Sequence, residues 1–182
     1  MARIYVKAGT LHQERLNQYK NVYDVYALLW ARFNKYKKEK DKIFCIRTVE
    51  CLVEEAGIRG KRTGLISEAA LNTKIKVAKG EKISKMESIS TEHPITYRSI
   101  AKYLLSQSKL PSYEYFYKCW LDNLVTVKTT FEENIKLKEY QKDFDIKTDC
   151  WKKDIYKKAK VKLTKDLHFK RSDVREALGI DA

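Results

Sequence analysis

The sequence predicts an α+β protein that is mostly helical. Apolar residues recur at helical spacing through most of the 182 residues, and only short segments are rich in β-branched residues. Two prolines and six glycines supply few turn formers, which favours helices over many short strands. Hydrophobic residues make up 43% of the chain, so it can build a core and is not a disordered basic tail.

The N-terminal third is predicted to be helical after a short strand at residues 3–7. Residues 11–33 place their leucines, tyrosines and other apolar side chains on one face of a helix, and the lysines that follow suit a helix C-terminus. A second helix is expected over residues 46–56, with Gly57 as its stop.

Residues 57–64 form a basic, glycine-rich connection that contains Arg59, Lys61 and Arg62. The spacing of its glycines does not match a phosphate-binding P-loop. Two interpretations stay open, a contact with the DNA backbone and a plain flexible link. A boundary here divides the chain into an N-terminal helical region, residues 1–60, and a core of residues 61–182.

The C-terminal two thirds mix helices and strands. Residues 73–84 could form a hairpin around Lys79-Gly80, and a helix is expected around residues 100–105. Pro111 and Ser112 open another helix, which runs to Leu121. The remaining expected elements are a strand over 124–127, a helix opened by the capping box Thr130-Phe131-Glu132-Glu133, a lysine-rich helix over 150–160 and a short helix over 172–178.

The charge balance indicates a polyanionic partner. The chain has 38 Lys and Arg against 24 Asp and Glu, a net charge of +14, whereas small soluble domains typically carry about 2–8 charges. Nucleic acid, and DNA in particular, is the expected partner, since basic groups that contact phosphates dominate affinity. The alternative is that the lysines only solubilise the surface. The basic residues expected to bind nucleic acid are Arg59, Lys61, Arg62, Lys152, Lys153 and Lys157.

Composition also bears on location and on metal binding. The first residues lack the apolar core of a signal peptide, and no stretch approaches the ~18 apolar residues of a membrane span, so a soluble, cytoplasmic protein without a membrane partner is expected. The four cysteines form no C-x-x-C pair, so free thiols are expected, with a zinc site made from all four as the alternative.

Three short segments carry residues suited to one-metal phosphodiester cleavage: Thr91-Glu92-His93, Asn123-Leu124-Val125 and Glu133-Asn134-Ile135. A histidine can deprotonate water near neutral pH, and carboxylate and amide oxygens suit magnesium. At residues 85–137 these segments resemble the HNH family of nucleases, in which an acidic-His pair ends one strand, an asparagine starts the next, and a helix follows. His93 is followed directly by Pro94, which departs from the family's usual spacing.

The resemblance implies a small ββα-metal centre, about residues 85–140, embedded between helices, with basic C-terminal helices beyond it. It implies that His93 is the general base, that Glu92 and Asn134 bind Mg²⁺ (or Mn²⁺), and that Asn123 orients His93. The implied function is a DNA endonuclease, like small phage-encoded or restriction-type enzymes, that leaves 5′-phosphate and 3′-hydroxyl ends. Cutting at a palindrome would favour a homodimer by symmetry.

Structural and functional alternatives stay open. Glu92 could be an ordinary exposed acid, His93 a hydrogen-bonded residue, and Asn123 the end of a helix. A different metal site could use Asp145-Ile146-Lys147 with Asp122. The chain could instead be a non-catalytic nucleic-acid-binding protein, such as a regulator, or a protein-interaction module that meets an acidic partner.

Overall fold

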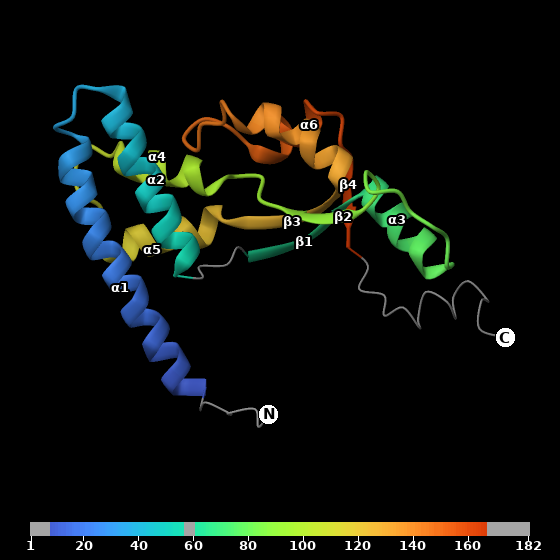
Figure 1. Ribbon diagram of the computed structural model, residues 1–182, viewed down its shortest axis with the longest axis horizontal. Coiled ribbons are helices and arrows are strands. Elements are labelled where there is room, and N and C mark those ends of the chain that lie inside the picture. Colours follow the sequence, from blue (N-terminus) through green and yellow to red (C-terminus); the bar gives the residue numbers. More distant parts are fainter. Residues whose placement is uncertain (1–7, 57–60, 167–182) are drawn as a thin grey trace. The chain divides into compact units, whose positions relative to one another are not determined.

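The structure is a computed structural model that describes the backbone of residues 8–56 and 61–166 and the side chains of 19–56 and 62–166. The predicted strand at 3–7, the helix stop at Gly57, the basic residue Arg59 and the helix at 172–178 lie outside the described residues. The helices are α1 (Ala8–Phe33), α2 (Glu39–Glu55), α3 (Glu68–Ala78), α4 (Tyr97–Leu105), α5 (Tyr113–Asn123), α6 (Phe131–Gln141) and the π-helical turn η1 (Lys152–Lys157). The strands are β1 (Lys61–Ser67), β2 (Ile89–Glu92), β3 (Val125–Thr130) and β4 (Leu163–Lys165) (Figure 1).

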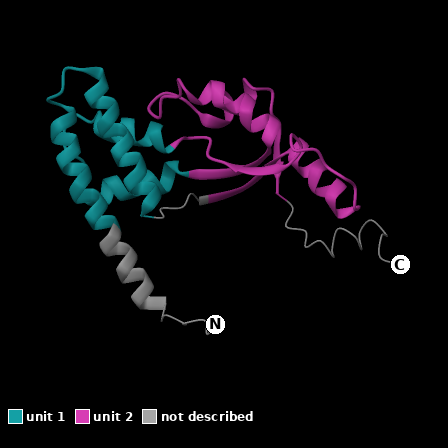
Figure 2. Cartoon of the chain, viewed as in Figure 1, with its two compact units in different colours: residues 1–59, 97–124 teal, residues 60–96, 125–182 magenta. Residues whose placement is uncertain are grey.

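The prediction of a mostly helical α+β fold is confirmed. The chain divides into two compact units, residues 1–59 with 97–124 and residues 60–96 with 125–182 (Figure 2). The boundary expected near residue 60 coincides with the start of the second unit. Residues 97–124, which the sequence assigned to the core, instead pack with the N-terminal helices. None of the described helices combines the length and the apolar composition that crossing a bilayer requires.

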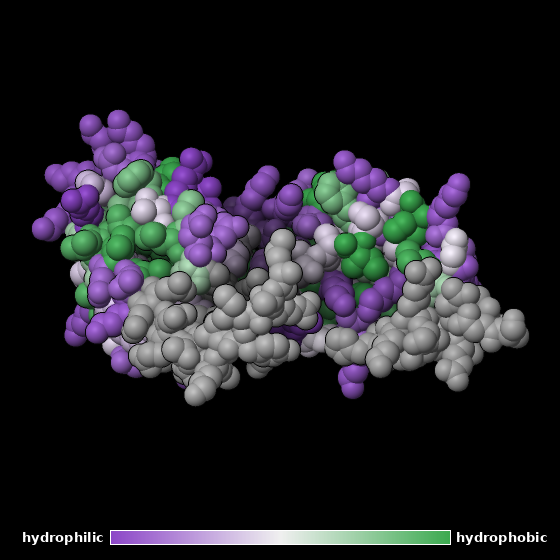
Figure 3. Space-filling view, turned by 60° about the horizontal axis from the view of Figure 1, so that its bottom comes forward, coloured by the Kyte–Doolittle hydropathy of each residue, from purple (hydrophilic) through white to green (hydrophobic). Residues whose placement is uncertain are grey.

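Unit 1 is a helical unit built from α1, α2, α4 and α5 around aromatic side chains. Tyr26 and Phe116 are fully buried, with ring centroids 4.6 Å apart, and the Tyr26 hydroxyl donates to the Leu104 carbonyl over 2.9 Å. The Ser112 side chain caps α5 by accepting from the Tyr115 amide, as the Pro-Ser pair predicts. In Figure 3 a group of hydrophobic residues is exposed on this unit, at the left.

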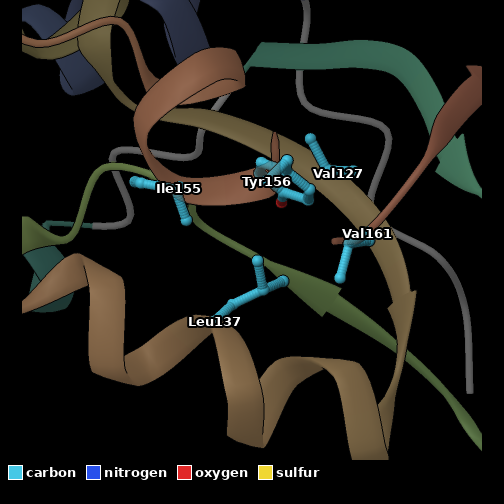
Figure 4. Packing of buried hydrophobic residues seen from close by; sticks show 5 residues of the cluster. All are labelled: Val127, Leu137, Ile155, Tyr156 and Val161. Atoms are coloured by element: carbon cyan, nitrogen blue, oxygen red, sulfur yellow. The ribbon is translucent and has the colours of Figure 1, made fainter. Parts of the chain in front are cut away.

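Unit 2 is built on a four-stranded mixed sheet with strand order β2-β3-β1-β4. β3 runs antiparallel to β2 and parallel to β1, while β4 is antiparallel to β1. One face of the sheet is covered by α6 and η1. The buried residues between these layers are Val127, Leu137, Ile155, Tyr156 and Val161 (Figure 4). Leu65 and Leu163 pack against the same cluster, so alternate residues of each strand must point to the opposite face.

The segment 57–64 is not a plain connection, because β1 begins at Lys61 and lies between β3 and β4. One of the three glycines that suggested a link, Gly64, adopts φ +69 where the register between β1 and β3 shifts. Only glycine takes this conformation without strain. The glycine therefore marks an irregularity inside a strand and not its absence.

The predicted hairpin at 73–84 is wrong, since residues 68–78 form the helix α3. The Ser67 side chain caps this helix by accepting from the Ala70 amide over 3.1 Å. Gly80, taken for a hairpin turn, has φ +81 and lies just beyond the helix C-terminus. Ile75 and Val77 alternate as in a strand, but the N-terminal cap and the alanines after it favour a helix.

The lysine-rich segment forms a shorter and wider helix than the one predicted at 150–160. Only Lys152–Lys157 forms a helical turn, of the π type, and Lys160 then adopts a positive φ of 57. β4 follows at residues 163–165 and was not predicted. A three-residue strand carries almost no pattern of its own, because it depends on pairing with β1.

Candidate functional site

The candidate site in unit 2 lies on an antiparallel strand pair followed directly by a helix. Glu92 ends β2 and pairs with Val127 of β3, and α6 begins at Phe131, the residue after β3. α6 contacts both strands. The capping box is formed as predicted: the Thr130 hydroxyl accepts from the Glu133 amide over 3.2 Å, and the Glu133 carboxylate accepts from the Thr130 amide over 3.0 Å.

Two of the predicted residues, Glu92 of β2 and Asn134 of α6, have side chains in the space between these elements. Asn134 donates from Nδ2 to the Ser90 hydroxyl over 3.3 Å, and Gln141 donates to Glu92. Ser90 and Glu92 are two apart on a strand, and Asn134 and Gln141 are seven apart on a helix, so each pair shares a face. Glu92 and Asn134 therefore face the same interlayer space, but each is bonded to a different partner.

Glu92 is a buried carboxyl group with only 5% of its surface exposed. One oxygen accepts from the Tyr156 hydroxyl and the other from the Gln141 amide. Burial raises the pKa of Glu92 to about 7, although both hydrogen bonds act to lower it. The alternative of an ordinary exposed acid is wrong, because η1 covers the carboxyl with Tyr156.

His93 is half-buried directly after β2, and its ring is held by the main chain of β3. Nδ1 lies 3.2 Å from the Val125 carbonyl oxygen. A carbonyl oxygen only accepts, so this contact requires the proton on Nδ1 and leaves a lone pair on Nε2 in the neutral ring. Gln141 also donates to the His93 carbonyl over 2.9 Å. Both the ring and the backbone of His93 are thus fixed.

The predicted orienting residue, Asn123, is the last residue of α5 and belongs to unit 1. Its Nδ2 donates to the Cys119 carbonyl over 2.9 Å and lies 3.6 Å from the Cys119 sulfur. This is the helix-end role that the sequence left open for Asn123. The described contact that orients the His93 ring comes from Val125, two residues further along the chain.

The divalent ion implied by the resemblance does not fit Glu92 in this arrangement. Magnesium needs accessible, ionised oxygen ligands and keeps several of its waters. Both Glu92 oxygens already accept hydrogen bonds, the group is 5% exposed, and burial raises its pKa to about 7. Asn134 donates from Nδ2 to Ser90, and no group of three or more His, Cys, Asp and Glu among the described residues could hold a metal.

The predicted basic residues are not all gathered on one face. Lys61 begins β1, and its side chain is not among those described, whereas Arg62 is exposed on the same strand. Lys152, Lys153 and Lys157 are exposed on η1. Since η1 packs its buried residues on the Val127 face of the sheet, and Arg62 pairs with the neighbouring Thr126, the η1 lysines and Arg62 lie on opposite sides of the sheet.

In the alternative metal site, the Asp145 carboxylate takes part in a local hydrogen bond of its own turn. Asp145 lies in a turn, where its carboxylate accepts from the Lys147 amide over 2.9 Å and its own amide donates to Asp149 over 2.8 Å. Asp122, its proposed partner, belongs to unit 1. The four cysteines are free: Cys45 and Cys119 are buried, and Cys51 and Cys150 are exposed.

Sequence reasoning missed three groups that shape the site. Gln141 carries a usable signal, because its spacing from Asn134 places both on one helix face. Tyr156 lies 64 residues from Glu92, and no local pattern joins them. The Asp166 side chain, 4% exposed, pairs with both Lys74 and Lys128, the latter over 2.7 Å.

Compared with known proteins, the chain matches no family model, no curated protein and no solved structure.

Proposed function

We propose that the chain is an endonuclease that hydrolyses phosphodiester bonds in DNA, with His93 as the general base. The observation that carries the proposal is the hydrogen bond between His93 Nδ1 and the Val125 carbonyl, because it directs the basic lone pair to Nε2. A general base needs this tautomer and a fixed orientation. The net charge of +14 supports a polyanionic substrate.

In the proposed reaction Nε2 of His93 takes a proton from a water molecule as the water oxygen bonds to phosphorus. The bond from phosphorus to the 3′ oxygen breaks, and that oxygen takes a proton from solvent. The products carry a 5′-phosphate and a 3′-hydroxyl. The His93 ring is left protonated and returns its proton to solvent.

The proposal includes a requirement for Mg²⁺ or Mn²⁺, which the HNH resemblance implies, but Glu92 does not fit as a ligand for the ion. It places the protein in the cytoplasm and expects a homodimer where both strands of a palindrome are cut. The ion requirement and the oligomeric state are each measurable without reference to the mechanism.

The test is nicking of supercoiled plasmid and of a single-stranded DNA circle, with Mg²⁺, with Mn²⁺ and with EDTA. We compare the wild type with His93→Ala and His93→Asn. Asparagine can still donate to the Val125 carbonyl but offers no base in place of Nε2, so it separates catalysis from support of the fold. We expect both variants to lose at least ~10²-fold in rate, and His93→Asn to keep the wild-type unfolding midpoint. Full activity in His93→Asn would exclude His93 as the base.

A second candidate is a DNA-binding protein without catalytic activity, such as a regulator. The burial of Glu92 favours it, because a carboxyl covered by Tyr156 and Gln141 packs the interior and does not fit as a metal ligand. This candidate predicts salt-dependent DNA binding by both wild type and His93→Asn, with no nicking under any of the three conditions.

A further inference from the structure

We propose that Arg62 binds the substrate phosphate beside His93, on the sheet face opposite Glu92. This inference rests on the proposed function for its substrate, the phosphodiester backbone of DNA. It goes beyond a general basic surface, because it assigns one cation to one position relative to the base.

A hydrogen bond and the strand register bring the two residues to adjacent positions of β3. Glu92 ends β2 and pairs with Val127, and the ring of the residue that follows, His93, has its Nδ1 3.2 Å from the Val125 carbonyl oxygen. Thr126, the next residue of β3, pairs with Arg62 of β1. Neighbouring strands lie about 4.8 Å apart, so Arg62 starts one strand away from the backbone that holds the His93 ring.

Arg62 is directed to the face opposite Glu92. Glu92 and Val127 point toward η1, as their contacts with Tyr156 and the buried cluster show. Thr126, the neighbour of Val127 on β3, therefore points away from η1, and Arg62, its partner on β1, points to the same face as Thr126.

On the same face, two described lysines share one carboxylate. Lys128, which pairs with Ile66, shares the single carboxylate of Asp166 with Lys74. Arg62 is exposed and belongs to none of the ion pairs formed by the described side chains. Attraction by both lysines lowers the pKa of Asp166 despite its burial, so that carboxylate stays ionised and still leaves one lysine charge in excess.

Arginine has the shape that this position requires. Its planar guanidinium binds phosphate through two parallel hydrogen bonds, and its long side chain can cover the distance to a group beside His93. Thr126 lies between them with a small side chain and a hydroxyl that can donate. A phosphate over Thr126 would meet Arg62 on one side and His93 on the other.

The first test measures binding without cleavage. Duplex DNA labelled with a fluorophore is titrated with the His93→Asn protein in EDTA, at several salt concentrations, alone and with Arg62→Ala, Arg62→Lys or Lys153→Ala added. We expect Arg62→Ala to weaken binding about 10-fold and to lower the salt slope by ~0.9, the value for one phosphate contact. Arg62→Lys should keep the salt slope but bind more weakly, because it loses the paired hydrogen bonds.

Lys153→Ala is the matched control, an exposed basic residue on the opposite side of the sheet. Unchanged binding in Arg62→Ala together with weakened binding in Lys153→Ala would overturn the inference and move the DNA to η1. If the wild type binds but never nicks DNA, and Arg62→Ala still lowers the slope, hydrolysis fails while the phosphate site stands. If the wild type nicks DNA and Arg62→Ala has wild-type kcat/KM and binding, the phosphate site fails while the nuclease stands.

Discussion

Replacing Glu92 by glutamine should make the protein more stable than the wild type at pH 8 but not at pH 5. Glutamine keeps the shape, its amide oxygen can accept from Gln141 and its amide nitrogen can donate to the Tyr156 hydroxyl, but it has no charge to bury. In the folded protein burial raises the pKa of Glu92 from an ordinary 4.5 to about 7. The folded chain therefore holds this proton up to about pH 7, whereas the unfolded chain releases it near pH 4.5.

The sign follows from proton binding. Between these two pH values the unfolded state binds fewer protons than the folded state, so the free energy of unfolding falls as pH rises. Each pH unit between 4.5 and about 7 corresponds to about 1.4 kcal/mol, which gives ~3 kcal/mol for the whole window. Above pH 7 the loss is complete, and the wild type carries the full cost of the buried charge.

The assay is urea unfolding at pH 5 and pH 8, in which the difference between Glu92→Gln and wild type cancels the titration of other groups. Because pH 5 already lies inside the window, we expect this difference to move by ~2.5 kcal/mol in favour of the variant at pH 8. Glu139→Gln, a change at an exposed residue of α6, is the control and should show no such movement. Parallel pH profiles for wild type and Glu92→Gln would show that this carboxyl is not buried as described.

Two further predictions concern unit 2. Thr130→Ala removes the hydroxyl that caps α6 and should lower the free energy of unfolding by about 1 kcal/mol, whereas Thr148→Ala in an exposed turn should change it little; equal effects would contradict the capping role. Leu137→Ala empties a fully buried position between α6 and the sheet and should cost about 2–5 kcal/mol by urea unfolding, against near zero for exposed Ile135→Ala. A small loss at Leu137 would mean that α6 does not pack on Val127.

Elements with their own local chemistry were predictable from the sequence. Ser112 and Thr130 are helix caps whose hydrogen bonds form within three residues, and both helices begin where the sequence predicts. The segments that were predicted wrongly depend on distant partners. The start of β1 was read as part of a link because the segment 57–64 is rich in glycine, and its strand character comes from pairing with β3, more than sixty residues away.

The candidate site divides in the same way. The strand that begins near Val125 and the capped helix that carries Asn134 were readable from local patterns, whereas the strand that ends at Glu92 was expected only from the family resemblance. The partners of those residues were not readable. Tyr156 covers Glu92 from an irregular π-helical turn, and Val125 holds His93 through a backbone carbonyl, which carries no side-chain signature. Sequence identifies the residue types of a site, while accessibility depends on the tertiary structure that covers it.

The stability and activity of Glu92→Gln together separate two roles for this carboxyl. Gln141 donates both to Glu92 and to the His93 carbonyl, so the buried group and the proposed base share one support. If glutamine at position 92 stabilises the fold at pH 8 and leaves nicking unchanged, the carboxyl is a packing group and the metal, if one is required, binds elsewhere. If the variant is more stable but nicks DNA at least ~10²-fold more slowly, the charge that costs stability serves the reaction at His93. Loss of activity without the gain in stability would instead mean that the substitution disturbs Gln141 and, through it, the position of His93.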